Sequence, residues 1–253
     1  MHHYLELVWY KACADLRAEA ARAYLGMLWW VLEPLLYMSV FYLVFGVLLG
    51  RGGEGFVSFL LCGLMIWRWF GSSVIRCANA IPANARLMLQ VYLPKYLFPA
   101  IALVTNTLRF LIVFSLYLIY LVLVEQTLSM TWLALPVLMV IQFLLIAACA
   151  SLLAAVVPFV PDLRILIENG LTLMLFMSGI FYDISTFPAD LRVYFYLNPM
   201  VTVIESYRAV LLEGVWPDWS AMGIVLLVAL LGLASALYLL TRFDRRYAKL
   251  AIS

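Results

Sequence analysis

Long apolar stretches constrain this chain more than any other feature. Six of them lie at residues 28–49, 56–78, 98–124, 131–157, 165–182 and 219–241. A helix needs about 20 apolar residues to cross roughly 30 Å of hydrocarbon. Of the 253 residues, 67% are hydrophobic and 12% are charged, whereas a soluble domain has about 25% charged residues. So few charges cannot cover a water-facing surface, and the sequence predicts an all-α membrane protein with six transmembrane helices.

The distribution of Lys and Arg predicts the orientation, because cytoplasmic loops of membrane proteins carry an excess of these residues. With the N-terminus inside, the cytoplasmic segments hold ten of the 16 Lys and Arg residues and the outer segments hold three. The spans hold the remaining three, Arg68, Arg76 and Arg109. We therefore expect both termini in the cytoplasm.

We interpret residues 1–253 as one transmembrane domain, with spans one to five in 28–182, an outer segment at 183–218, the last span at 219–241 and a cytoplasmic tail at 242–253. Residues 1–26 carry an apolar stripe at helical spacing: Leu5, Val8, Trp9, Ala12, Leu16 and Ala20. This stripe predicts an amphipathic helix in the cytoplasmic interface. It is either a simple anchor or a lever beside a transport path.

Several kinds of chemistry have no residues to support them. His2 and His3 are the only histidines, and the four cysteines form no CxxC pair, so no metal site is indicated. No GxxxxGK[ST] loop occurs, so the chain lacks that means of binding ATP. A net charge of +2 gives no sign of nucleic-acid binding. Intramembrane carboxylates, which proton-coupled carriers use, are scarce. We expect the energy for any transport to come from another polypeptide.

Three groups of motifs lie along most of the chain. The first span begins with Arg22-x-x-Leu25-Gly26-x-x-Trp29-Trp30-x-x-x-Pro34-Leu35. The second span and its loop contain Trp67-x-x-Phe70, Asn79, Asn84 and Val91-Tyr92-Leu93-Pro94-Lys95. The most specific group is Ser178-Gly179-Ile180-Phe181-Tyr182, Leu197-Asn198-Pro199-Met200, Tyr207-Arg208 and Glu213-Gly214. Together these motifs resemble the permease subunits of type-2 ABC exporters, in the polysaccharide branch. Two departures are Gly179, where proline is usual, and Val160-Pro161-Asp162, where an Arg-Asp pair is usual.

The resemblance implies a transport subunit and not an enzyme. It implies a homodimer that pairs with two copies of a separate nucleotide-binding subunit, which would bind ATP and Mg. The cargo would be a lipid-linked polysaccharide such as an O-antigen, and the location the bacterial inner membrane. The alternatives are another cargo for the same architecture (teichoic acid, capsule or a hydrophobic small molecule), a membrane enzyme acting on lipid-linked sugars, and a passive channel or scaffold.

Aromatic stripes and two arginines are the candidate channel lining. On one face of span one lie Trp30, Tyr37, Phe41 and Phe45, and on one face of span three lie Phe110, Phe114 and Tyr117. Sugar C–H faces pack on such rings, but helix packing and interfacial belts explain the stripes equally. Arg68 and Arg109 fall near mid-bilayer, where each needs a partner or a wet cavity. They either attract a diphosphate-linked lipid carrier or pair with Glu33, Glu168 or backbone carbonyls.

The loop at residues 82–95 is the candidate contact with the ATPase. We expect a short helix there that docks by an apolar face with charged ends, formed by Arg86, Leu87, Met88, Val91, Tyr92 and Lys95. The alternative is a helix that rests on the membrane surface.

The outer segment 183–218 is too apolar for a free loop and is cut by prolines into pieces too short to span. We expect a re-entrant helical hairpin in which 187–196 dips inward and 200–213 returns. Pro199 would begin the second helix and Gly214 would end it. The outer gate candidates are Phe187, Tyr194, Tyr196, Asn198 and Pro199. The alternative is an amphipathic hairpin lying flat on the outer surface.

Overall fold

The computed structural model describes residues 2–22, 26, 28–48, 50, 53, 55–90, 93–125, 128–244 and 246–247. Within these ranges the chain is helical and contains no strand. The α-helices are α1 His2–Arg22, α2 Leu28–Phe41, α3 Phe56–Ala83, α4 Ala85–Gln90, α5 Leu97–Tyr120, α6 Leu135–Val156, α7 Leu163–Phe176, α8 Ala189–Tyr196, α9 Pro199–Arg208 and α10 Trp219–Arg242. Turns of other pitch are η1 Tyr42–Leu48, η2 Leu121–Glu125, η3 Met130–Ala134, η4 Ile184–Thr186 and η5 Ala209–Glu213.

Five helical runs within the described residues are long and apolar enough to cross a membrane: Leu28–Leu48, Phe56–Ala83, Leu97–Glu125, Met130–Val156 and Trp219–Arg242. They coincide, to within a few residues, with five of the six stretches that the sequence predicted. The all-helical fold class and the multi-span architecture are therefore confirmed.

The fifth predicted span differs from the structure. A continuous crossing over 165–182 was predicted, but α7 ends at Phe176 and has 14 residues. At 1.5 Å per residue it is about 21 Å long. The helix ends because residues 177–182 turn around Gly179, whose φ is +67°. A Cβ at this position would lie 2.7 Å from Ile184 Cδ1, and a proline could not adopt a positive φ. The turn therefore requires the glycine at position 179, where the motif of the resembled family usually has proline.

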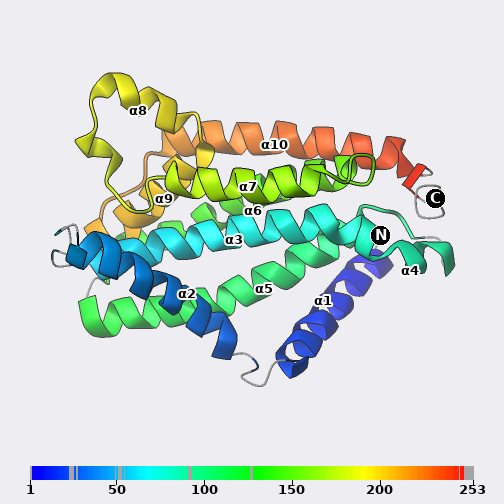
Figure 1. Ribbon diagram of the computed structural model, residues 1–253, viewed down its shortest axis with the longest axis horizontal. Coiled ribbons are helices and arrows are strands. Elements are labelled where there is room, and N and C mark those ends of the chain that lie inside the picture. The colour runs from blue at the N-terminus through cyan, green and yellow to red at the C-terminus, as the bar shows by residue number, and fades with distance from the viewer. Residues whose placement is uncertain are drawn as a thin grey trace.

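Helix α3 lies at the centre of the bundle. In its apolar window 72% of the residues are buried, against 11% for the α2–η1 run and 22% for α10. It packs against α5, α6, α7 and α9, while α6 packs along α10. Figure 1 shows α3, α6, α7 and α10 running along the long axis, with α8 and α9 at one end and α4, the start of α1 and the end of α10 at the other.

Helix α1 packs against α5 and lies at an angle to the long axis of the bundle (Figure 1). The helix forms where the sequence predicted it, but its apolar stripe is divided. Val8 and Ala12 are buried against the protein, and Leu16 and Ala20 pack on the core. Leu5 and Trp9 remain exposed.

The loop after α3 contains the short helix that the sequence predicted, α4. Two of the candidate docking residues, Met88 and Lys95, are buried and do not lie at the surface as predicted. Met88 is buried in a small cluster, defined here as the α4-end cluster, with Ala80, Ile81, Phe98, Ala155, Leu240 and Tyr247. Arg86 and Leu87 are exposed as expected. Val91 and Tyr92 lie outside the described residues.

Lys95 was expected to offer its charge to a partner, whereas the structure places its side chain in the interior. Its side chain is buried, and its Nζ lies 3.8 Å from Asp244 Oδ2 in the C-terminal tail. Its backbone N–H donates to Asp244 Oδ1 at 3.0 Å. A buried ammonium group needs a nearby carboxylate to offset its lost hydration. Tyr247, which donates to the Ala155 carbonyl at 3.0 Å, holds the tail in place.

The outer segment forms two short helices with the predicted boundaries. Asn198 Oδ1 accepts a hydrogen bond from the Met200 N–H at 3.1 Å and caps α9, which begins at Pro199. Gly214, with φ +66°, ends the helical run. The two helices are unequally buried: α9 packs between α3, α6 and α10, whereas α8 has no buried residue. The segment is therefore one core helix with an exposed helix over it.

Candidate functional site

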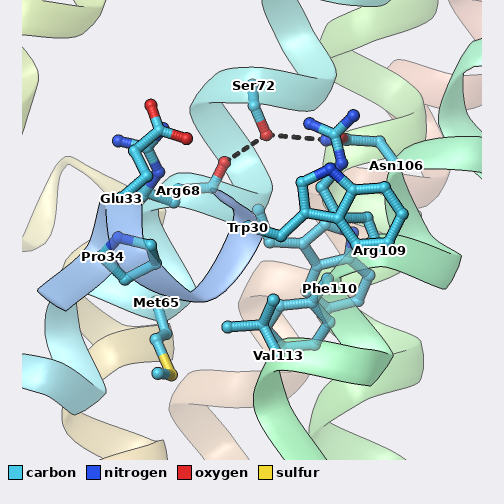
Figure 2. A pocket seen from close by; sticks show the side chains of 11 residues that line it. Trp30, Glu33, Pro34, Met65, Arg68, Ser72, Asn106, Arg109, Phe110 and Val113 are labelled. Carbon is cyan, nitrogen blue, oxygen red and sulfur yellow. Dashed lines mark hydrogen bonds and ion pairs between the residues drawn. The ribbon is translucent and has the colours of Figure 1, made fainter. Parts of the chain in front are cut away.

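Several polar side chains of α2, α3 and α5 line a cavity between these helices (Figure 2). It has a volume of about 60 Å³. Its lining residues are Trp30, Glu33, Pro34, Met65, Arg68, Trp69, Ser72, Asn106, Arg109, Phe110 and Val113.

Helical spacing places the polar side chains of α3 and α5, including Arg76 next to the cavity-lining ones, on common helix faces. Arg68, Ser72 and Arg76 recur every four residues along α3, so they lie on one face of that helix. Asn106 and Arg109 are three residues apart on α5 and also share a face. The sequence prediction included Arg68 and Arg109 but missed the other three. The spacing from Arg68 to Arg76 was the signal that could have revealed that polar face.

Glu19 of α1 joins two of the guanidinium groups. Its Oε1 accepts from Arg76 Nη2 at 2.7 Å and its Oε2 from Arg76 Nη1 at 3.4 Å. Oε2 also forms an ion pair with Arg109 Nη2. One carboxylate therefore bridges α1, α3 and α5, and α1 is attached to the bundle by charge as well as by its apolar residues.

Arg68 forms an ion pair with Glu33 of α2, and the two residues lie beside each other in Figure 2. Each cavity-lining guanidinium also lies over an aromatic ring. Arg68 Cζ is 5.1 Å from the centre of the Tyr37 ring, and Arg109 Cζ is 5.2 Å from that of Trp30. Such contacts contribute about 0.5–2 kcal/mol each. Pairing with Glu33 was one of the alternatives that the sequence left open, whereas Glu168 forms no ion pair within the described part of the chain.

Asn106 is a buried amide at the cavity wall, 2% exposed. Its Nδ2 donates to Ser72 Oγ and to Ser73 Oγ, both at 2.7 Å. Its Oδ1 has no hydrogen-bond partner among the described residues, and the same holds for Arg109 Nε. Buried polar atoms in proteins nearly always have partners. The cavity therefore retains one acceptor and one donor for a polar ligand or water.

The pKa of Glu19 reflects these contacts. Burial raises it, but the hydrogen bond and charge of Arg76 and the charge of Arg109 outweigh burial, so the pKa lies below the ordinary value of 4.5. A lowered folded-state pKa stabilises the fold above the unfolded-state pKa, and this contribution is lost as the pH falls through the folded-state value. The link between α1 and the bundle is therefore fully ionised at neutral pH.

The predicted aromatic lining divides into three groups. Trp30 and Phe110 line the cavity, and Phe110 stacks on Trp69 with ring centres 4.1 Å apart. Phe114 and Tyr117 lie in the protein core, as the helix-packing interpretation expected. Phe41 and Phe45 pack on Phe181, and Tyr37 is exposed.

The predicted outer gate residues lie around α8. Phe187 packs on Tyr182 and Phe195, and Tyr194 is exposed. Tyr196 donates from its hydroxyl to Glu205 Oε1 of α9 at 3.2 Å. Asn198, besides capping α9 beside Pro199, donates from Nδ2 to Ser178 Oγ at 2.9 Å. These contacts connect the turn after α7 with both helices of the outer segment.

Comparison with known proteins gives the family. The family model for the ABC-2 type transporter matches residues 8–212, most of the chain and all of the elements that build the cavity. The chain belongs to the ABC-2 type transporter family. The O-antigen export system permease protein RfbA of Myxococcus xanthus is 32% identical over 206 residues, covering 81% of this chain and 79% of that protein. A protein of the same description from Klebsiella pneumoniae is 25% identical over 201 residues, covering 79% of this chain and 78% of that protein.

Family membership confirms two predictions from the sequence motifs. The resemblance to type-2 ABC permeases is correct, and the relatives carry the description of permeases for O-antigen export. Together with the five apolar helices, this makes the chain a multi-pass protein of the inner membrane.

Proposed function

We propose that this chain is the membrane subunit of an ATP-driven exporter that moves a lipid-linked polysaccharide of the O-antigen kind out of the cytoplasm. The observation that carries the proposal is the arginine-lined cavity of an ABC-2 type chain, with Arg68 and Arg109 on its wall. A guanidinium group presents two parallel N–H donors that match phosphate oxygens. The cavity would hold the diphosphate that links a glycan to its lipid carrier.

The exposed apolar faces support assembly as a homodimer. Only 11% of the α2–η1 apolar window and 22% of the α10 window are buried within one chain, so these faces must contact lipid or protein. A glycan loses the hydrogen bonds of its hydroxyl groups unless it crosses through a hydrated passage. Two copies can enclose such a passage at their interface, where exposed rings such as Tyr37 would face the sugar.

Our proposed topology has six crossings with both termini in the cytoplasm. It is supported by the position of the start of α1 and the end of α10 at one end of the bundle (Figure 1) and by the packing of α7 against α3. Helix α7 would cross together with the turns at 177–182. The α8–α9 segment would then be a re-entrant hairpin at the outer mouth. Thiol labelling of single cysteines across 189–212 from outside tests this arrangement, and uniform strong labelling contradicts it.

The function is tested by reconstitution with the partner ATPase in lipid vesicles. We expect the chain to co-purify with a nucleotide-binding subunit, and the complex to move a diphosphate-linked glycan only when ATP is hydrolysed. Transport by the chain alone would indicate a passive channel. Glycosyl transfer by the chain alone would indicate an enzyme. Selective movement of a different cargo would agree with the proposed transporter architecture but would exclude a polysaccharide as the cargo.

Helix α4 is the proposed contact with the ATPase. Because Met88 lies inside the protein, the docking surface reduces to the exposed pair Arg86 and Leu87 within the described residues. The double variant Arg86→Glu/Leu87→Asp should lower co-purification of the ATPase at least about tenfold, since a residue central to an interface contributes about 2 kcal/mol or more. Thermal stability of the chain alone should not change.

A matched control lies at the opposite end of the molecule. Asp190 and Leu191 on α8 are also an exposed charge followed by an exposed leucine. The variant Asp190→Lys/Leu191→Asp should leave ATPase binding unchanged. Equal binding by the α4 variant and wild type would show that the ATPase docks elsewhere.

A further inference from the structure

Glu19 occupies a place suited to a phosphate group. Its two oxygens face Arg76 of α3 and Arg109 of α5, with bidentate contact to Arg76. A phosphate group makes the same pair of contacts with arginine. The cluster formed by Glu19, Glu33, Arg68, Arg76 and Arg109 contains three cations and two carboxylates. It therefore has an excess positive charge even with both carboxylates in place.

The cavity beside this cluster, with a volume of about 60 Å³, is lined by Arg109 but not by Glu19 or Arg76. A diphosphate can reach both Arg76 and Arg109 only if the side chain between them moves. Within the described residues, Glu19 is the one carboxylate that forms an ion pair with both guanidiniums.

Helix α1 is suited to move with Glu19. One side of the helix faces the protein, with Val8 and Ala12 buried and Leu16 and Ala20 packed on the core, and Glu19 adds ion pairs to α3 and α5. Loss of that bridge leaves a helix held by a narrow apolar stripe. Leu5 and Trp9, exposed on its surface, would stay in contact with lipid.

We infer that Glu19 is an internal substitute for the cargo phosphate, and that binding of a lipid-linked diphosphate between Arg76 and Arg109 displaces it and releases α1 from the bundle. The inference rests on the proposed function, because Arg109 both pairs with Glu19 and lines the cavity proposed to hold the diphosphate. It makes α1 a sensor of cargo at the cavity. By linkage, diphosphate binding weakens the attachment of α1 by the same factor by which attached α1 weakens diphosphate binding.

The test measures binding of farnesyl diphosphate to the full chain in phosphatidylcholine nanodiscs, together with hydrogen exchange of the α1 amides. The variant Glu19→Gln should bind the probe more tightly, by about five- to tenfold, the lower part of the usual range for coupled sites. Glu19→Asp keeps the charge but is one methylene shorter, so its affinity for the probe should lie between those of the wild type and Glu19→Gln. Saturating probe should accelerate exchange across residues 10–22 in the wild type. Glu6→Gln, an exposed carboxylate on the same helix, is the matched control and should change neither measurement.

Each outcome has a separate meaning. If neither the wild type nor Glu19→Gln binds the probe, the phosphate role of the cavity fails, and the proposed function loses its supporting observation. If the wild type binds and Glu19→Gln binds equally or more weakly, Glu19 is only structural, and the inference is wrong while the proposed function stands. If phosphatidylglycerol in the nanodiscs accelerates α1 exchange as much as the probe does, ordinary lipid phosphate is the trigger, and α1 does not sense cargo.

Discussion

Replacing Arg208 by glutamine is expected to destabilise the protein by about 3 kcal/mol or more, since each buried carbonyl that loses its donor costs about 1–3 kcal/mol. Arg208 is buried and donates to three backbone carbonyls: from Nη1 to Gly179 at 2.7 Å, from Nη2 to Ile180 at 2.8 Å, and from Nε to Phe59 at 3.3 Å. Its guanidinium also lies 3.4 Å from the centre of the Phe59 ring. One side chain thereby joins α9, α3 and the turn after α7.

The measurement is thermal unfolding of the purified chain in detergent, where 3 kcal/mol corresponds to a decrease of roughly 6–12 °C for a chain of this size. Gly63→Ala should have a similar effect by another route, because its Cβ would lie 2.7 Å from Arg208 Nη2 and 3.2 Å from Ile180 Cγ2. Arg192→Gln is the control. That arginine donates to one carbonyl, of Phe187, and its loss should cost less than about 1.5 kcal/mol.

An Arg208→Gln protein that unfolds at the wild-type temperature would contradict this account. It would mean that the turn at Gly179 and Ile180 holds its shape without the three donors. The position of α9 would then depend on apolar packing alone.

Replacing Arg109 by glutamine is expected to reduce export at least about tenfold while leaving the chain folded. The variant removes the cation between Glu19 and Trp30, and a hydrogen bond to a charged group contributes about 1.5–3 kcal/mol. Neutral glutamine is cheaper to hold within a membrane than arginine, so folding should not suffer. Arg68→Gln should also reduce export. Export is measured as ATP-dependent movement of a diphosphate-linked glycan by the reconstituted complex.

Two further variants separate charge from geometry. Arg109→Lys keeps the charge but loses the two-pronged contact with a phosphate, so its export should lie between those of the wild type and Arg109→Gln. Arg242→Gln removes an exposed arginine at the end of α10, away from the cavity, and should export normally. Wild-type export by Arg109→Gln would exclude a phosphate role for that residue.

The features that the sequence determined are local ones. Apolar stretches of spanning length cannot remain in water, so five of the six predicted spans form the long helices of the structure. The boundaries of the helical run formed by α9 and η5 follow equally from single residues. Pro199 lacks the N–H that the first turn of a helix leaves unpaired, and Gly214 accepts the left-handed conformation that ends one.

The tertiary structure decided the partners of the polar groups. Arg109 needed a counter-charge, but many carboxylates could have supplied it, and only the packing of α1 on α5 brings Glu19 there. Met88 and Lys95 belong to a polar loop, yet the C-terminal tail folds over them and buries both. Periodicity shows which residues share a helix face, and it carries no information on which distant segment covers that face. For the same reason the sequence indicated arginines in need of a ligand, and the fold alone placed Glu19 between them.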